Sequence, residues 1–305
     1  FSSRRRHTRY GTVTGVQTCA LPILQLGWRA HSWQSQGSAG ALLQLRGPGG
    51  QQQWHRCRWL VDATGQQRAL IGEAADLVSG AGVEWLLQVP LERWQPWADG
   101  LHFMLGSSWV PQGYGWVFPM QPGQLKLGVC RLSDPGVAQP PLHRLLAQLQ
   151  QRLDLQEAQV LDRHGGLIRS SIRRREAHQR GRLLGLGDAV STANLLGGEG
   201  IRHALSSSAV LAPLLLRALA GEERALRRYP TLLRRRLGWR WSLSGRLAQR
   251  TWLGLKGDRG DQRLERLLAG LEARASAEDL SALLFDYRFE RYGLRALPYL
   301  LGWRR

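Results

Sequence analysis

The chain has 305 residues, a formal net charge of +19 and 43% hydrophobic residues. This length can bury a sizeable core, and the charge favours phosphorylated cofactors or an anionic membrane surface as partners. The arginines are dispersed, without zinc-ligand spacing or an RNA-binding signature, so nucleic acid is excluded as a partner. No run of about 18 apolar residues occurs, so we expect no segment that spans a bilayer. The few cysteines favour a cytoplasmic protein, with at most peripheral membrane contact. Cys57 and Cys130 lack metal-ligand spacing, and we expect no metal site.

We expect the first 23 residues to be non-native, and a genuine basic arm is the alternative. Residues 1–23 have neither helical nor strand periodicity, and they lack the continuous apolar stretch of a signal peptide. They resemble translated sequencing-adapter read-through, so Leu24 is taken as the first native residue. Without the four arginines of this segment the net charge is +15. We therefore expect that native sequence upstream of Leu24 is missing.

The stretch 24–65 is expected to be rich in β-strands. A strand over 41–45, a turn at 47–50 and an alternating return from Trp54 predict a hairpin. Small residues then follow a buried strand in Leu60-Val61-Asp62-Ala63-Thr64-Gly65. Ligands of doubly wound sheets lie beyond the carboxyl ends of strands, which makes Asp62 and Gly65 candidate ligand-binding residues. An ordinary Asp-x-x-Gly turn is the alternative.

The stretch 66–160 is expected to hold short strands and one helix. Tyr114, Trp116 and Phe118 alternate before Pro119, so on an extended strand the three rings face the same side. They could form the core of a sheet or one wall of an apolar ligand pocket. Leucines at helical spacing predict a helix over 140–155, and Gly165-Gly166 predicts a turn just beyond it.

A strand, a turn with one acid, a glycine-rich loop and a helix follow one another in 183–220. This order suits a cofactor whose phosphates lie at a helix N-terminus, and Asp188 could accept a hydrogen bond from a cofactor hydroxyl. A glycine-rich connection capped by Asp188 is the alternative. From residue 221 onward the chain is expected to be a helical, arginine-rich cap. The candidate cofactor-binding residues of the motif are Gly187, Asp188, Ala189, Gly197, Gly198, Glu199, Gly200 and Ile201.

Taken in order, the segments 60–65, 113–119 and 187–201 resemble the motifs of the geranylgeranyl reductase family, flavoproteins within the aromatic-hydroxylase-like group of FAD enzymes. The resemblance implies an α/β fold with a Rossmann-like FAD-binding domain formed by 24–65 and 161–220. It also implies an inserted antiparallel β-sheet substrate domain over 66–160 and a C-terminal helical region over 221–305.

The same resemblance implies roles for the motif residues. Asp188 would lie at the ribityl–pyrophosphate region of FAD, the loop 197–201 beside the flavin ring, and 62–65 near the ADP side. Tyr114, Trp116, Phe118 and Pro119 would line the pocket of a long apolar isoprenoid substrate. The implied reaction is reduction of C=C bonds, with NADPH or ferredoxin as the electron donor.

The sequence departs from the family in several places. It contains no G-x-G-x-x-G turn, so the first βαβ unit of the FAD-binding domain is missing and we expect the chain as given to bind FAD poorly. Val190 and Ser191 stand where the family often shows Ala-Gly, and Cys130 replaces a glycine.

Other functions remain open at this point. A lycopene-cyclase-like enzyme or an FAD-dependent monooxygenase would share the Gly-Asp-Ala segment. A non-catalytic, basic membrane-surface lipid-binding module is the alternative from another class. No catalytic residue is identified: His102, His164, His178 and His203 are candidate proton donors in principle, and each is more readily an ordinary surface or core residue.

Overall fold

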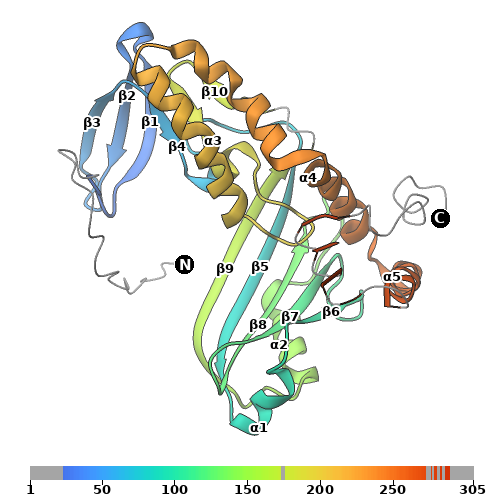
Figure 1. Cartoon of the computed structure of the whole chain (residues 1–305). Coiled ribbons are helices and arrows are strands. Elements are labelled where there is room, and N and C mark those ends of the chain that lie inside the picture. Colours follow the sequence, from blue (N-terminus) through green and yellow to red (C-terminus); the bar gives the residue numbers. More distant parts are fainter. Residues whose placement is uncertain are drawn as a thin grey trace.

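The computed structural model describes residues 23–172 and 176–272, together with 276, 278–279, 282–283 and 286–288. The first sheet is antiparallel and consists of β1 (Arg29–Ser35), β2 (Ala41–Arg46) and β3 (Gln52–Cys57). β2 and β3 form the hairpin that the sequence predicts, with Leu43 opposite His55. This sheet lies at one end of the molecule (Figure 1).

The second sheet joins two motifs that are far apart in the sequence. It contains β10 (Gln179–Arg180), β11 (Leu183–Gly185) and β4 (Leu60–Asp62), and β11 runs parallel to β4. Because Gly185 is the partner of Asp62, both strands end at the same edge of the sheet. A first core of buried residues packs around this sheet and the helix α3 (Ile201–Leu219); it includes Leu183, Leu184, Leu211, Leu214, Tyr229 and Leu233.

The third sheet is antiparallel, with the strand order β6-β7-β8-β5-β9. Its strands are β5 (Leu77–Gln88), β6 (His102–Leu105), β7 (Gly113–Pro119), β8 (Gln124–Leu132) and β9 (Gln159–Ser171). The predicted helix is confirmed as α2 (Leu142–Arg152), and the short α1 (Leu91–Trp94) lies at the end of the sheet (Figure 1). A second core lies between α2 and the sheet, and it includes Val117, Leu127, Leu145, Leu146 and Leu149.

The turn expected at Gly165-Gly166 is wrong. Both glycines lie inside β9, where Gly165 is paired with Val83 and Gly166 with Gly82. β9 follows β5 along almost its whole length, and this long-range pairing outweighs the local tendency of two glycines to turn. The boundary expected at residue 160 therefore falls within β9, and residues 161–171 belong to the five-stranded sheet.

The C-terminal part is helical, as expected, over the residues that the structure describes. The 3-10 helix η5 (Glu223–Arg228) leads into α4 (Tyr229–Gly254) and then α5 (Gly257–Glu272). α4 changes direction at Gly238, whose φ of 80° and ψ of 169° are not helical. Before this point Leu233 lies in the first core, and after it α4 enters a third core that includes Leu132, Leu195, Leu196, Trp241, Ala248 and Trp252.

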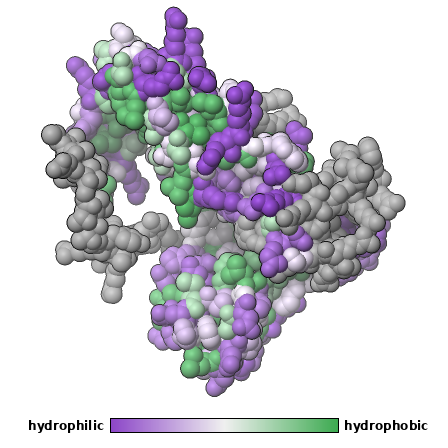
Figure 2. Space-filling model, in the orientation of Figure 1, coloured by the Kyte–Doolittle hydropathy of each residue, from purple (hydrophilic) through white to green (hydrophobic). Residues whose placement is uncertain are grey.

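The outer face of α3 is apolar and exposed. The exposed fractions of Ile201, Leu205 and Leu216 are 82%, 66% and 67%. Figure 2 shows hydrophobic surface over this part of the molecule. Within the described residues, no helix combines the length and the apolar character needed to cross a membrane.

Candidate functional site

The Gly-Asp-Ala motif forms a tight turn beneath α3. It is the 3-10 helix η4 (Gly187–Val190), which follows β11 directly. Gly187 has a φ of +61°, a conformation that favours glycine, and its N–H donates to Ser207 Oγ of α3 at 3.0 Å. The turn ends at Ser191, which is also left-handed with a φ of 58°. Strand, turn and helix are thereby fixed relative to one another.

Arg68 holds this turn from below, a role that the sequence did not suggest. Its guanidinium donates to the carbonyl oxygen of Ala189 at 2.8 Å and to Ser191 Oγ at 2.6 Å, and only 2% of Arg68 is exposed. Ser191 Oγ also accepts the N–H of Ser171, at the end of β9, at 2.9 Å. The Ser191 side chain therefore links the second and third sheets.

Asp188 lies beside the residue that precedes α3. Its Oδ1 accepts a hydrogen bond from Thr192 Oγ1 at 3.2 Å. A Cβ added to Gly200 would lie 3.5 Å from Asp188 Oδ2, so the motif acid and the glycine loop are in direct proximity. Burial raises the pKa of the Asp188 carboxyl, and the Thr192 bond and the charge of Arg68 only partly offset this. A hydrogen bond from a hydroxyl group would thus stabilise the charged Asp188 carboxylate, and a ribityl chain carries such hydroxyl groups.

The Asp62 carboxylate is engaged with its own turn. Oδ1 accepts from the N–H and the hydroxyl of Thr64 at 3.0 and 2.6 Å, and Oδ2 accepts from the N–H groups of Leu70 and Ile71 at 2.9 and 2.8 Å. Burial alone would raise the pKa of Asp62, but these hydrogen bonds outweigh it and lower the pKa. Asp62 shapes the turn that carries Gly65 (φ +70°), and its expected contact with the ADP side of a cofactor stays a prediction.

The aromatic residues of β7 share one face, as predicted. The ring centroids of Tyr114 and Trp116 are 5.9 Å apart, those of Trp116 and Phe118 are 6.0 Å apart, and Phe103 of the neighbouring strand lies 5.4 Å from Phe118. We call these four residues the aromatic face. Val117, between them in the sequence, is fully buried in the second core on the α2 side. The aromatic face is therefore the half-buried side of the sheet, opposite α2.

Trp116 packs in this face over a glycine that has no side chain to obstruct the ring. Its indole ring lies over Gly128, where an added Cβ would approach Trp116 Cζ2 to 2.1 Å. The indole N–H donates to Glu84 Oε2 at 3.0 Å, and Glu84 is also paired with Lys126 at 3.1 Å. Gly128 of β8 is thus a packing requirement of Trp116.

The glycine loop meets the aromatic face at Tyr114. The Tyr114 hydroxyl donates to the carbonyl oxygen of Gly197 at 3.2 Å, and a Cβ added to Gly198 would lie 3.4 Å from that hydroxyl. Trp252 of α4 contacts both parts: its ring centroid is 5.1 Å from that of Tyr114, and its N–H donates to Leu196 O at 3.1 Å. Trp252 is a second residue that the sequence did not suggest.

The end of the loop presents backbone and apolar groups at the start of α3. Asn194 N–H donates to Glu199 O at 2.7 Å, and the Glu199 carboxylate pairs with Arg202 at 2.6 Å. Gly200, at the N-cap, places no side chain over the first N–H groups of α3, and the first turn contains no acid. Ile201 is exposed there. The helix N-terminus therefore has no side-chain cap, and its positive dipole end lies beside Asp188.

Apart from Asp62 and Gly65, which lie in a turn of their own, the candidate residues divide into two sets. Gly187, Asp188, Ala189 and Gly197 to Ile201 come together with Tyr114, while Trp116, Phe118 and Pro119 extend away along β7. Of the candidate histidines, His203 lies in the first turn of α3 and stacks on Tyr287, while His178 packs against Tyr229. Among the described residues, no group of three His, Cys, Asp or Glu side chains is placed to hold a metal.

The residues present fit the flavin and ribityl part of FAD. Gly200 leaves open the space beside Asp188, and the uncapped start of α3 offers donors to a phosphate or a flavin oxygen. The ADP part is normally held by the glycine-rich turn of a βαβ unit, and the sequence contains no such turn. The fit is therefore to one half of the cofactor.

Neither a protein-family profile nor a curated protein matches the chain. Among solved structures, it is similar to a geranylgeranyl bacteriochlorophyll reductase-like protein from Thermoplasma acidophilum, with 20% identity over 90% of this chain and 69% of that one, at a TM-score of 0.68. It is also similar to p-nitrophenol 4-monooxygenase from Pseudomonas putida, with 18% identity over 85% and 65% of the chains and a TM-score of 0.58. The myxobacterial chondrochloren halogenase, an FAD-dependent halogenase, shows 14% identity over 90% and 68%, with a TM-score of 0.55.

The chain shares its fold with these enzymes. This confirms the expected mixed α/β fold of FAD-dependent proteins in its coarse form. The similarity to the reductase-like protein and to a monooxygenase at comparable identity leaves the reaction to the site itself.

Proposed function

We propose that the chain is part of an FAD-dependent oxidoreductase that reduces C=C bonds of a long apolar, isoprenoid substrate. The observation that carries the proposal is the contact between Tyr114 and Gly197, which joins the candidate cofactor loop to the aromatic face. A substrate lying on the aromatic face would reach the loop at this point. Cofactor and substrate would then meet without further rearrangement of either sheet.

Each part of the site has a task in this function. The backbone of Gly197 to Gly200 allows close approach of a flat ring, and Asp188 accepts a hydrogen bond from a ribityl hydroxyl. FAD, when bound and reduced, would supply a hydride to one alkene carbon, and a proton would be delivered to the neighbouring carbon. Trp116 and Phe118 bind the apolar chain, at about 25 cal/mol for each Å² of apolar surface removed from water. The Tyr114 hydroxyl orients the loop through Gly197 O.

A second candidate function is an FAD-dependent monooxygenase. The similarity to p-nitrophenol 4-monooxygenase favours it, because an aromatic substrate could also pack on the rings of the aromatic face. The two reactions differ in the product and in oxygen use. We also propose NADPH or ferredoxin as the electron donor. The basic surface would contact an anionic membrane.

The test uses the purified protein loaded with FAD, and a chemical reductant in place of the natural donor. Incubation with a geranylgeranyl substrate without oxygen should yield a product that has gained two hydrogen atoms per reduced bond, as read by mass spectrometry. A hydroxylated product formed only with oxygen would establish the monooxygenase instead. If neither an isoprenoid nor an aromatic substrate yields a reduced or a hydroxylated product, both candidate functions are rejected.

A pair of variants tests the aromatic face. Trp116→Leu removes a ring from it and should raise KM about tenfold, which corresponds to the 1–3 kcal/mol typical of one apolar group in a pocket. The control is Trp54→Leu, because Trp54 is 47% exposed on β3, in a different sheet. Equal KM values for the two variants would remove the aromatic face from the proposal.

A further inference from the structure

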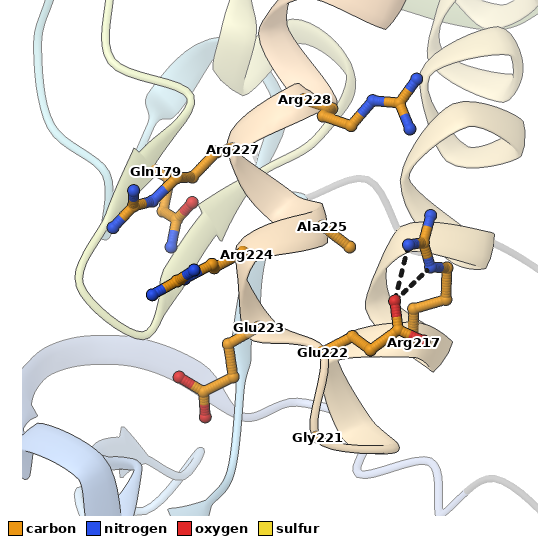
Figure 3. Close-up of a pocket in the computed structure, with 9 residues that line it drawn as sticks. All are labelled: Gln179, Arg217, Gly221, Glu222, Glu223, Arg224, Ala225, Arg227 and Arg228. Atoms are coloured by element: carbon orange, nitrogen blue, oxygen red, sulfur yellow. Dashed lines mark hydrogen bonds and ion pairs between the residues drawn. The ribbon is translucent and has the colours of Figure 1, made fainter.

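A basic cavity lies apart from the candidate flavin site. It has a volume of about 810 Å³, within the usual range of roughly 300–1,000 Å³ for ligand pockets, and it opens between β10, the end of α3 and η5 (Figure 3). Its lining residues are Gln179, Arg217, Gly221, Glu222, Glu223, Arg224, Ala225, Arg227 and Arg228. None of them belongs to the motifs that carry the proposed function.

Both acids of the cavity are already neutralised by arginines. Arg217 donates to Glu222 Oε2 through Nε at 3.0 Å and through Nη2 at 2.6 Å. Arg182, which is largely buried and stacks over Trp59, pairs with Glu223 Oε1 at 2.5 Å. Neither carboxylate is therefore available as a counter-ion for the other guanidinium groups of the cavity.

Three arginines of η5 remain without an acidic partner. Within the part of the chain that the structure describes, no ion pair joins Arg224, Arg227 or Arg228 to a carboxylate. Residues three apart on a 3-10 helix lie on the same side, and Figure 3 shows Arg224 and Arg227 on the side of Gln179. Two like charges held side by side repel each other, so an anion between them lowers the electrostatic energy.

The arginines are carried by a rigid element. Between them in the sequence, Ala225 and Leu226 are buried in the first core, with exposed fractions of 5% and 1%. The adjoining Tyr229 is fully buried. The backbone of η5 therefore presents the guanidinium groups from a fixed position, while their side chains stay exposed.

We infer that this cavity binds a phosphate group, with Arg224 and Arg227 as the principal ligands. Gln179, whose Nε2 donates one N–H to Gly181 O at 2.9 Å, is an additional donor through its second N–H. A guanidinium fork matches two phosphate oxygens, and charge-assisted bonds of this kind are about twice as strong as neutral ones. A doubly charged phosphate also offsets both arginines at once, which a carboxylate does not. The phosphate could belong to a soluble ligand or to an anionic lipid headgroup, and the experiment separates these sources.

The test compares two double variants that remove the same charge. Arg224→Ala/Arg227→Ala removes the proposed ligands, and Arg259→Ala/Arg263→Ala removes two exposed arginines of α5. All four side chains are exposed, so neither variant alters a core; thermal unfolding verifies this, and Arg227→Gln alone serves if the first variant unfolds. Binding of inorganic pyrophosphate is measured by calorimetry, and binding of phosphatidylcholine vesicles with and without phosphatidic acid by sedimentation.

We expect Arg224→Ala/Arg227→Ala to weaken pyrophosphate binding at least about tenfold, as the loss of one or two charge-assisted bonds predicts, and the α5 variant to leave it unchanged. If Arg224→Ala/Arg227→Ala also loses binding to vesicles that contain phosphatidic acid, while binding to pure phosphatidylcholine vesicles is unchanged, a lipid headgroup is the source of the phosphate. Equal losses in both variants, or no loss in either, would overturn the inference. Flavin binding should be the same in both variants, so failure of the proposed function is measured separately.

Discussion

The hydroxyl of Tyr114 on β7 donates a 3.2 Å hydrogen bond to the carbonyl oxygen of Gly197 in the loop before α3. This bond joins the five-stranded sheet to the glycine loop. Burial raises the pKa of the Tyr114 hydroxyl well above its ordinary value, so the group stays protonated and remains a donor across the physiological range.

Tyr114→Phe should loosen this contact with little change in packing. The expected loss is about 0.5–1.5 kcal/mol in the free energy of unfolding, the usual net value of one hydrogen bond, because the ring contacts with Trp252 remain. Urea unfolding followed by tryptophan fluorescence measures it. In the FAD-loaded protein the flavin should also dissociate faster, and an unchanged rate would mean that the loop does not depend on Tyr114.

Arg68→Ala should be strongly destabilising. It leaves Ala189 O without the buried guanidinium bond and removes one of the two donors to Ser191 Oγ, and each charge-assisted bond contributes about 1.5–3 kcal/mol. Arg56→Ala is the matched control, since Arg56 is exposed on β3. Comparable urea midpoints for the two variants would show that the turn at 187–191 holds without Arg68.

Gly128→Ala should displace Trp116 from the aromatic face. The new methyl group would overlap the indole ring at 2.1 Å, so the ring must turn and leave Glu84; overpacking of this kind costs about 1–3 kcal/mol. Gly166→Ala on the same sheet meets nothing within 4 Å and should be close to neutral. Unfolding midpoints and the tryptophan emission spectrum distinguish the two, and similar spectra would contradict the packing role of Gly128.

Asp188→Asn should stabilise the protein at neutral pH. The pKa of Asp188 is raised in the folded state, so folding loses stability through this group as the pH rises above the ordinary Asp value of about 3.9. Asparagine removes that loss and keeps an acceptor for Thr192. The difference in the free energy of unfolding, variant minus wild type, should therefore increase from acidic to neutral pH.

Asp62→Asn supplies the contrast to this result. The pKa of Asp62 is lowered, so its contribution is present above the ordinary value and disappears as the pH falls through the folded one. An amide group cannot accept all four hydrogen bonds, and the variant should be destabilised most at neutral pH. A pH dependence of the same sign for Asp62→Asn and Asp188→Asn would contradict the assigned causes.

Much of this architecture was predictable from local patterns. The hairpin before β4, the helix α2 and the common side of Tyr114, Trp116 and Phe118 follow from periodicity and turn residues, which act over short distances. The continuation of β9 through Gly165-Gly166 was not predictable, because it depends on pairing with β5, far away in the sequence. Local glycine content favours a turn at this point, whereas long-range pairing with β5 favours a strand.

The candidate site shows the same division. The sequence identified Asp62 and Asp188 as acids at strand ends, and both lie there. It gave no sign that the Asp62 carboxylate is taken up by four donors of its own turn, or that Arg68 and Trp252 hold the glycine motif. In the sequence, Ser191 stands out only as a difference from the motif that the segment 187–201 resembles. In the structure it compensates for its left-handed backbone with hydrogen bonds to Arg68 and Ser171.

The change of direction of α4 at Gly238 has a consequence for how the molecule comes apart. One side of this helix is anchored in the first core through Leu233 and the other in the third core through Trp241, and Leu237 packs against both. Unfolding of either core therefore disrupts a helix that also packs in the other core, so the two cores are coupled. We expect amide protons on the two sides of Gly238 to exchange at similar rates, as members of one cooperative unfolding unit.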